Sequence, residues 1–331
     1  MPVVVSNNPL LVVKSGINQL YLFDKQSFPY YEAYLRGDET SEDLKRLVSA
    51  NMKLFSIHMP STTVYGDQIV PVDFCKERVI GQASFEKLDQ LIHFCDTNKV
   101  RFIVIHLGFY NSLTENRYDI LDSVAKKLNR LNPRTVKLCI ENVPNWGTLS
   151  FEHEPIISDE DHFLYLKERC PSIGAVFDVD HLAINTVFNH FYPLFKQRYT
   201  SNQQAPLMEQ EIHEETNRNP QFFKSMIEQS IESFLSRIQP DLIHAVGSDF
   251  CNYLLVGRLP LIGEALPLQF EGTIKGRSVK DRLDHTQWLS LVSKDTPIVI
   301  EVHLREEYDY VNEMKNSWGV LIDLIQKNIK T

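Results

Sequence analysis

Seven side chains that could bind a metal ion or move a proton stand at or near the ends of apolar runs. They are His58, His106, Glu141, Asp178, His181, His244 and Glu301. The runs otherwise consist of residues such as Val, Ile, Leu and Phe, where an ionised group is costly to bury without a partner. Imidazole and carboxylate groups together bind divalent cations. The pattern predicts a site for one or two ions, Mn²⁺ or Zn²⁺ first, with Mg²⁺ or Co²⁺ as alternatives.

Taken one at a time, these residues differ in how strongly they indicate a metal site. A single histidine near a strand end is usually a hydrogen-bonded histidine, so His58 or His106 alone would indicate little. A carboxylate inside an apolar run, such as Glu141 or Glu301, has few structural explanations beyond a buried ion pair. Asp180 shares a side of its run with Asp178, and we expect Asp178 to be the deeper of the two. One shared site explains the joint pattern better than independent structural roles.

Eight continuous apolar runs, typical of parallel strands covered on both sides, must position these groups. They lie at residues 1–6, 19–23, 53–59, 100–108, 136–143, 174–181, 241–247 and 297–303. Helical signals between them predict one domain over residues 1–331, a (β/α)8 TIM barrel, with an open doubly wound sheet as the alternative. In such a barrel the carboxyl ends of the strands converge on one face, where active sites form.

Helical spacing is clearest in two segments, one with Leu121, Val124, Ala125 and Leu128, the other with Phe223, Ile227, Ile231 and Phe234. Ser158 and Asp161 resemble a capping box before a third helix. Residues 185–240 are too long for a simple connection between the sixth and seventh strands. We expect a helical excursion there, which is the best candidate for a lid or a partner surface.

The composition restricts the class of protein. Hydrophobic residues make up 43% and charged residues 23% of 331 residues, typical of a globular protein with a large core. A net charge of −9 gives no bulk attraction to nucleic acid or anionic membranes. Five cysteines without a CxxC pair indicate reduced structural thiols. Without a signal segment or a long apolar run, the expected location is cytoplasmic; a homo-oligomer is left open.

The order His, His, Glu, Asp-x-x-His, His, Glu resembles the xylose isomerase-like TIM barrels, which include sugar isomerases, epimerases and endonuclease IV-type abasic-site nucleases. The resemblance implies that Glu141, Asp178, His244 and Glu301 hold one catalytic metal, with the two glutamates as acid and base. It implies that His58 and His106 hold a second metal with Glu141 as the bridging ligand. His181 would bind a third nuclease metal or contact sugar.

Three functions follow from this resemblance. The first is isomerisation or epimerisation of a sugar or sugar phosphate through a metal-stabilised enediolate, with a small carbohydrate as the partner. The second is two-metal hydrolysis of phosphodiesters, supported by His58 and His106. It ranks lower because no Asp-x-His pair precedes Glu271 and Gly272, which leaves the third nuclease metal site incomplete. The third is a non-catalytic binding scaffold, which the complete first ligand set disfavours.

Overall fold

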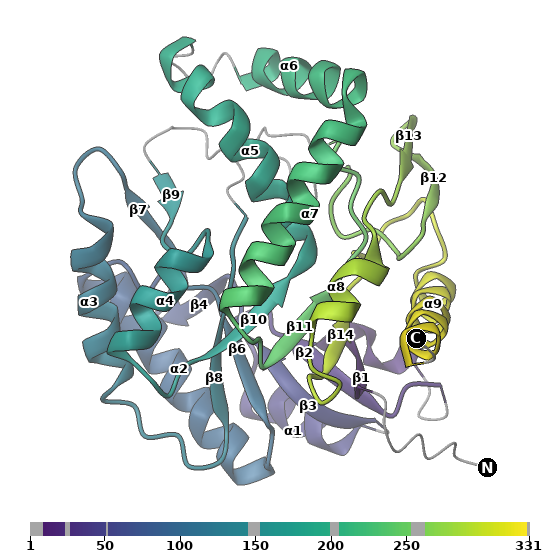
Figure 1. The fold of residues 1–331 in the computed structure, drawn as a ribbon. Coiled ribbons are helices and arrows are strands. Elements are labelled where there is room, and N and C mark those ends of the chain that lie inside the picture. Colours follow the sequence, from purple (N-terminus) through teal and green to yellow (C-terminus); the bar gives the residue numbers. More distant parts are fainter. Residues whose placement is uncertain are drawn as a thin grey trace. The chain divides into compact units, whose positions relative to one another are not determined.

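Eight parallel strands close into a barrel in the computed structural model (Figure 1). The structure describes residues 9–23, 27–50, 52–144, 153–198, 205–252 and 262–329. The strands, in barrel order, are β1 (Leu11–Gly16), β14 (Ile298–Ile300), β11 (Leu242–Ala245), β10 (Gly174–Asp178), β8 (Lys137–Glu141), β6 (Phe102–Ile105), β3 (Lys53–His58) and β2 (Tyr30–Tyr34). The predicted TIM barrel is therefore confirmed, and the alternative open sheet is wrong.

The first two strands differ from the prediction. The expected strand at 1–6 lies outside the described residues, and β1 follows it. The expected strand at 19–23 is wrong, because Ile17–Leu22 form the 3-10 helix η1, in which no residue is buried. The second barrel strand is instead β2, which pairs with β3 so that Tyr34 lies opposite His58. The other six strands overlap their expected positions.

The chain divides into two compact units, Lys14–Val176 and the combination of Met1–Val13 with Phe177–Thr331. The first unit contains α1 (Ser41–Ser49), α2 (Arg78–Asn98), α3 (Arg117–Leu128) and α4 (Glu160–Arg169), with the antiparallel pairs β4 (Thr62–Tyr65) with β5 (Gln68–Pro71) and β7 (Phe109–Asn111) with β9 (His153–Pro155). The second contains α5 (Val179–Arg198), α6 (Ala205–Arg218), α7 (Pro220–Arg237), α8 (His285–Leu291) and α9 (Tyr310–Ile329), with the hairpin β12 (Glu271–Ile274) and β13 (Arg277–Lys280). No described helix is both long and apolar enough to span a membrane.

The apolar spacing places the buried faces of helices as expected. All four apolar residues predicted for α3, and all four predicted for α7, are buried. The ring of Phe234 stacks on Phe177 of β10 at a centroid distance of 5.0 Å, which packs α7 against that strand. The predicted cap of α4 is wrong by one residue. Asp159, not Ser158, is the N-cap, because its side chain accepts a hydrogen bond from the backbone N–H of His162.

Between residues 185 and 237, every residue that the structure describes is helical except Asn219. The segment 185–240 contains most of α5 and all of α6 and α7. Figure 1 shows α5 and α7 side by side, with α6 across the start of α7. Phe191 of α5 stacks on Phe223 of α7 with ring centroids 5.6 Å apart, so aromatic packing joins the two helices. A role as a lid or partner surface remains a prediction.

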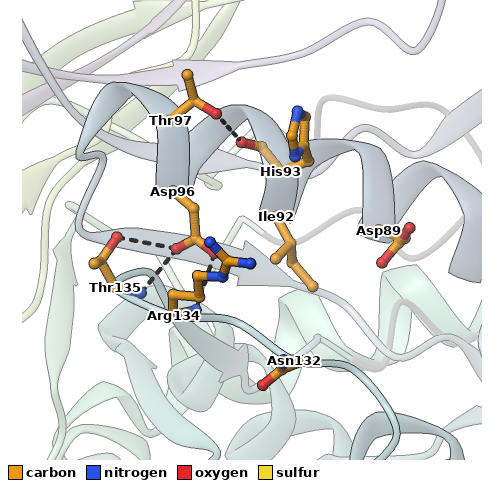
Figure 2. A pocket seen from close by; sticks show the side chains of 8 residues that line it. All are labelled: Asp89, Ile92, His93, Asp96, Thr97, Asn132, Arg134 and Thr135. Atoms are coloured by element: carbon orange, nitrogen blue, oxygen red, sulfur yellow. Dashed lines mark hydrogen bonds between the residues drawn. The ribbon is translucent and has the colours of Figure 1, made fainter.

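The start of β8 is held by a carboxylate at the end of α2. Asp96 accepts backbone hydrogen bonds from Arg134, Thr135 and Val136 at 2.8–2.9 Å, and Figure 2 shows this anchor beside a surface pocket. Partial burial acts to raise the pKa of Asp96, but these hydrogen bonds outweigh it and lower the pKa to about 2. The anchor fixes where β8 begins, and therefore where its last residue, Glu141, stands.

Candidate metal centre

One group of three predicted ligands lies in the unit Lys14–Val176. His58 is the last residue of β3, His106 directly follows β6, and Glu141 is the last residue of β8. The strands pair as β3–β6–β8, so adjacent strands deliver their final side chains to one place. His58 and Glu141 are buried, whereas the His106 side chain is 34% exposed and forms the open side. We call these residues the His–His–Glu triad.

Hydrogen-bond chemistry indicates what the His–His–Glu triad can hold. Nδ1 of His58 lies 2.9 Å from the carbonyl oxygen of Met59, which can only accept, so Nδ1 carries a proton. In the neutral ring Nε2 is then an acceptor, yet it lies 3.0 Å from Oε2 of Glu141. Two acceptors this close repel each other unless a cation or a second proton lies between them. The donor set therefore fits a metal ion.

Both histidines approach the same carboxylate oxygen. Nε2 of His106 lies 3.1 Å from Oε2 of Glu141, and the two imidazole rings meet edge to face with centroids 4.8 Å apart. Ligand atoms around one ion with bonds of about 2.1 Å are themselves about 3.0–3.5 Å apart in octahedral or tetrahedral geometry. The separations within this triad agree with that spacing.

The other group lies in the unit that contains Phe177–Thr331. Asp178 is the last residue of β10, His244 is the third residue of β11, and Glu301 directly follows β14. Nδ1 of His244 lies 3.4 Å from Oε2 of Glu301 and 3.7 Å from Oδ2 of Asp178. Both distances are long for hydrogen bonds; the shorter lies within the spacing expected for ligands of one cation, and the longer lies slightly beyond it. We call these residues the Asp–His–Glu triad.

His181 and Asp180 stand beside this triad in the first turn of α5. The backbone N–H of His181 donates to Oδ1 of Asp178 at 2.7 Å, and Nδ1 of its ring lies 3.8 Å from the same oxygen. Asp180 is as buried as Asp178 and accepts a hydrogen bond from the backbone of Ala265. Burial raises the pKa of Asp180 well above its usual range, and nearby Glu264 and Asp178 add to the effect.

Comparison with known proteins identifies the family. A family model described as a xylose isomerase-like TIM barrel matches residues 11–205, more than half of the chain. The chain belongs to this family. No curated protein sequence matches it.

Solved structures agree with the xylose isomerase-like fold. A D-tagatose 3-epimerase-like protein is 13% identical, with 97% of this chain and 98% of that chain covered and a TM-score of 0.58. A xylose isomerase domain protein from Planctomyces limnophilus is 12% identical, with 98% of each chain covered and a TM-score of 0.57. The IOLI protein with a binding zinc atom is 12% identical, with 96% and 99% covered and a TM-score of 0.53. Identities this low show the fold alone.

Two aromatic side chains near the triads were not predicted. The ring of Tyr34 lies 5.2 Å from the ring of His58, and it was missed because β2 was assigned to the wrong residues. His303 has Nε2 4.0 Å from Oε1 of Glu301. The sequence did indicate His303, because alternation by two residues along a strand places it on the same side as Glu301.

Proposed function

We propose that this member of the xylose isomerase-like family is a divalent-metal-dependent isomerase or epimerase of a sugar or sugar phosphate. The observation that carries the proposal is the Asp–His–Glu triad, two carboxylates and an imidazole with spacing suited to one cation. The Glu301 side chain is 14% exposed, whereas Asp178 and His244 are almost fully buried. One carboxylate of the triad therefore remains accessible to a substrate.

In this proposal Asp178, His244 and Glu301 hold a cation, Mn²⁺ or Zn²⁺ first. The family resemblance adds Glu141 as a further ligand. A bound divalent cation would polarise substrate oxygens and stabilise negative charge on them. The similarity to structures named as a D-tagatose 3-epimerase-like protein and a zinc-binding IOLI protein supports this reading.

The proposed proton transfer uses the two glutamates. A carboxylate within hydrogen-bond reach of a carbon beside a carbonyl can remove its proton and return it elsewhere. Glu301 and Glu141 are assigned this work, and His181 is assigned contact with the substrate. Glu141 is fully buried against His58 and His106, so whether its carboxylate can contact a substrate depends on what those two rings bind.

The His–His–Glu triad favours a second candidate, a two-metal hydrolase of phosphodiesters. Two ions could activate water and stabilise the leaving oxygen. Metal analysis of the purified protein separates the two candidates. The isomerase predicts one equivalent that His58→Ala leaves unchanged; the hydrolase predicts two, of which that variant loses one. His93→Ala, an exposed histidine on α2, is the matched control.

The reaction itself is tested by solvent deuterium uptake. The isomerase proposal predicts incorporation of deuterium into at least one member of a panel of ketoses and their phosphates. Glu301→Gln should abolish this uptake, and its circular dichroism spectrum should show that the chain remains folded. Glu306→Gln, which changes an exposed glutamate in the same segment, should keep both the uptake and the fold of the wild type. Retained turnover in Glu301→Gln would overturn the site assignment, and no uptake with any substrate would refute the isomerase.

A further inference from the structure

A groove of about 410 Å³ runs between the start of α2 and the end of α3, apart from both triads in sequence and chemistry. Phe85 and Leu131 give it an apolar floor, and Arg78, Lys127 and Arg130 line it with positive charge. No described residue that lines it is acidic. The groove is therefore positively charged, whereas the chain as a whole carries a net charge of −9.

The three cations have no carboxylate partner among the residues that the structure describes. Nζ of Lys127 lies 5.5 Å from the centroid of the Phe85 ring, a cation–π contact that holds the charge over the floor. Glu86, one turn along α2 from Gln82, accepts a hydrogen bond from that side chain and does not line the groove. The positive charge of the groove is therefore left for a ligand.

Arg78 occupies its place at a cost to the fold. Its φ of 55° lies in the left-handed region, which non-glycine residues rarely adopt. It is also the first residue of α2, where the helix dipole disfavours a cation. The N-cap residue Glu77 is acidic but makes no side-chain capping hydrogen bond, and the first turn itself contains no acidic residue. Helix stability therefore does not explain why an arginine occupies this position.

The position of Lys127 in the groove has a simpler explanation. Lys126 and Lys127 lie in the last turn of α3, where cations stabilise the helix dipole. That explanation does not reach Arg78, which comes from another helix, nor the apolar floor beneath the charges. Lys126 is a suitable control, because it also lies in the last turn of α3 but does not line the groove.

We propose that this groove is a binding site for an organic phosphate, with the phosphate group among the three cations and a ring or other apolar body against Phe85 and Leu131. A phosphate monoester carries a charge of about −1.5 to −2 at neutral pH and offers three acceptor oxygens. The volume suits a small molecule, since ligand sites enclose about 300–1,000 Å³. A polymer such as nucleic acid would need a longer basic track than three side chains.

Isothermal titration calorimetry on the full-length protein tests this with three probes: phenyl phosphate, inorganic phosphate and phenol. We expect phenyl phosphate to bind more tightly than inorganic phosphate, and phenol to bind negligibly. Arg78→Gln and Lys127→Gln should each weaken binding about tenfold, as expected for one charge-assisted contact. Lys126→Gln should leave the affinity unchanged, and thermal unfolding should show that all three variants fold.

Three results would overturn the proposal. Binding of phenyl phosphate that survives both groove variants would place the anion elsewhere, for example at a triad. Equal losses in Lys126→Gln and Lys127→Gln would indicate general electrostatic attraction without a built site. A single-stranded oligonucleotide that binds more tightly than phenyl phosphate, and is lost in the same variants, would show that the groove belongs to a nucleic-acid surface.

Discussion

Removal of Glu141 distinguishes a metal ligand from half of a buried ion pair. Its Oε2 lies 3.0 Å from Nε2 of His58 and 3.1 Å from Nε2 of His106, and the side chain has no exposed surface. If these contacts are a histidine–glutamate ion pair, Glu141→Gln leaves a buried charge unpaired, at a cost of about 3–5 kcal/mol. That cost would not depend on metal. If Glu141 is a ligand, its effect depends on whether the cation is present.

The magnitude follows from ligand linkage. A cation at about 1,000 times its Kd stabilises the folded state by about 4 kcal/mol. Each kcal/mol moves the Tm by about 2–4 °C in a chain of about 150–250 residues and by about 2 °C or less in a longer one, so chelation should lower the wild-type Tm by about 8 °C or somewhat less. In Glu141→Gln the same chelation should produce a much smaller shift, because the ligand that held the cation is already gone.

The assay is thermal unfolding of wild type and Glu141→Gln, each with excess chelator and after Zn²⁺ or Mn²⁺ is restored. Glu154→Gln is the control, since Glu154 binds Arg117 and lies outside both triads. A wild-type Tm that does not respond to chelation, together with an equal loss in Glu141→Gln under both conditions, would refute metal ligation by this residue. The His–His–Glu triad would then be a structural ion pair.

Three further predictions concern the elements that position the triads. Asp96→Asn should lower the free energy of unfolding by about 1 kcal/mol at pH 7, measured by urea unfolding. Because the pKa of Asp96 in the folded protein, about 2, lies below its value in the unfolded chain, this stabilisation of the wild type should disappear as the pH falls from about 4 to 2. Gly108→Ala should destabilise the loop after His106, because φ is 106° and an added Cβ would lie 2.1 Å from Oδ1 of Asp73; calorimetry should show a lower Tm. Phe234→Ala should cost about 3–5 kcal/mol in chemical unfolding, because its fully buried ring stacks on Phe177.

The strand ends could be predicted because burial makes polar residues informative. Glu141 and His244 interrupt runs that are buried on both faces, where an ionised or polar group has few stable roles. Both runs became strands within two residues of the expected bounds. The helices α3 and α7 could also be predicted, because their apolar residues recur at helical spacing. All eight apolar residues predicted for the two helices are buried.

The N-terminal third of the barrel was harder to predict because two short apolar segments compete there. QLYLF and YYEAY are both rich in aromatic residues, and strand propensity alone does not separate them. In the structure Tyr21 is 83% exposed, whereas Tyr31 is fully buried and its hydroxyl donates to the carbonyl of Leu47. Pairing with β3 decides between them, and that contact is not contained in either segment. Glu32 of the YYEAY segment is buried and accepts a hydrogen bond from Ser56 on β3.

The same polar residue shows how the reasoning applied to later strands could have been extended to β2. Glu32 is a buried carboxylate in a short run, as Glu141 is, and its neighbour two residues on, Tyr34, reaches the ring of His58. A carboxylate flanked by aromatic or apolar residues can therefore indicate a barrel strand. This criterion favours residues 30–34 over residues 19–23, where no acidic residue occurs. The chemistry of a buried site is therefore better evidence for the strands than their apolar residues alone.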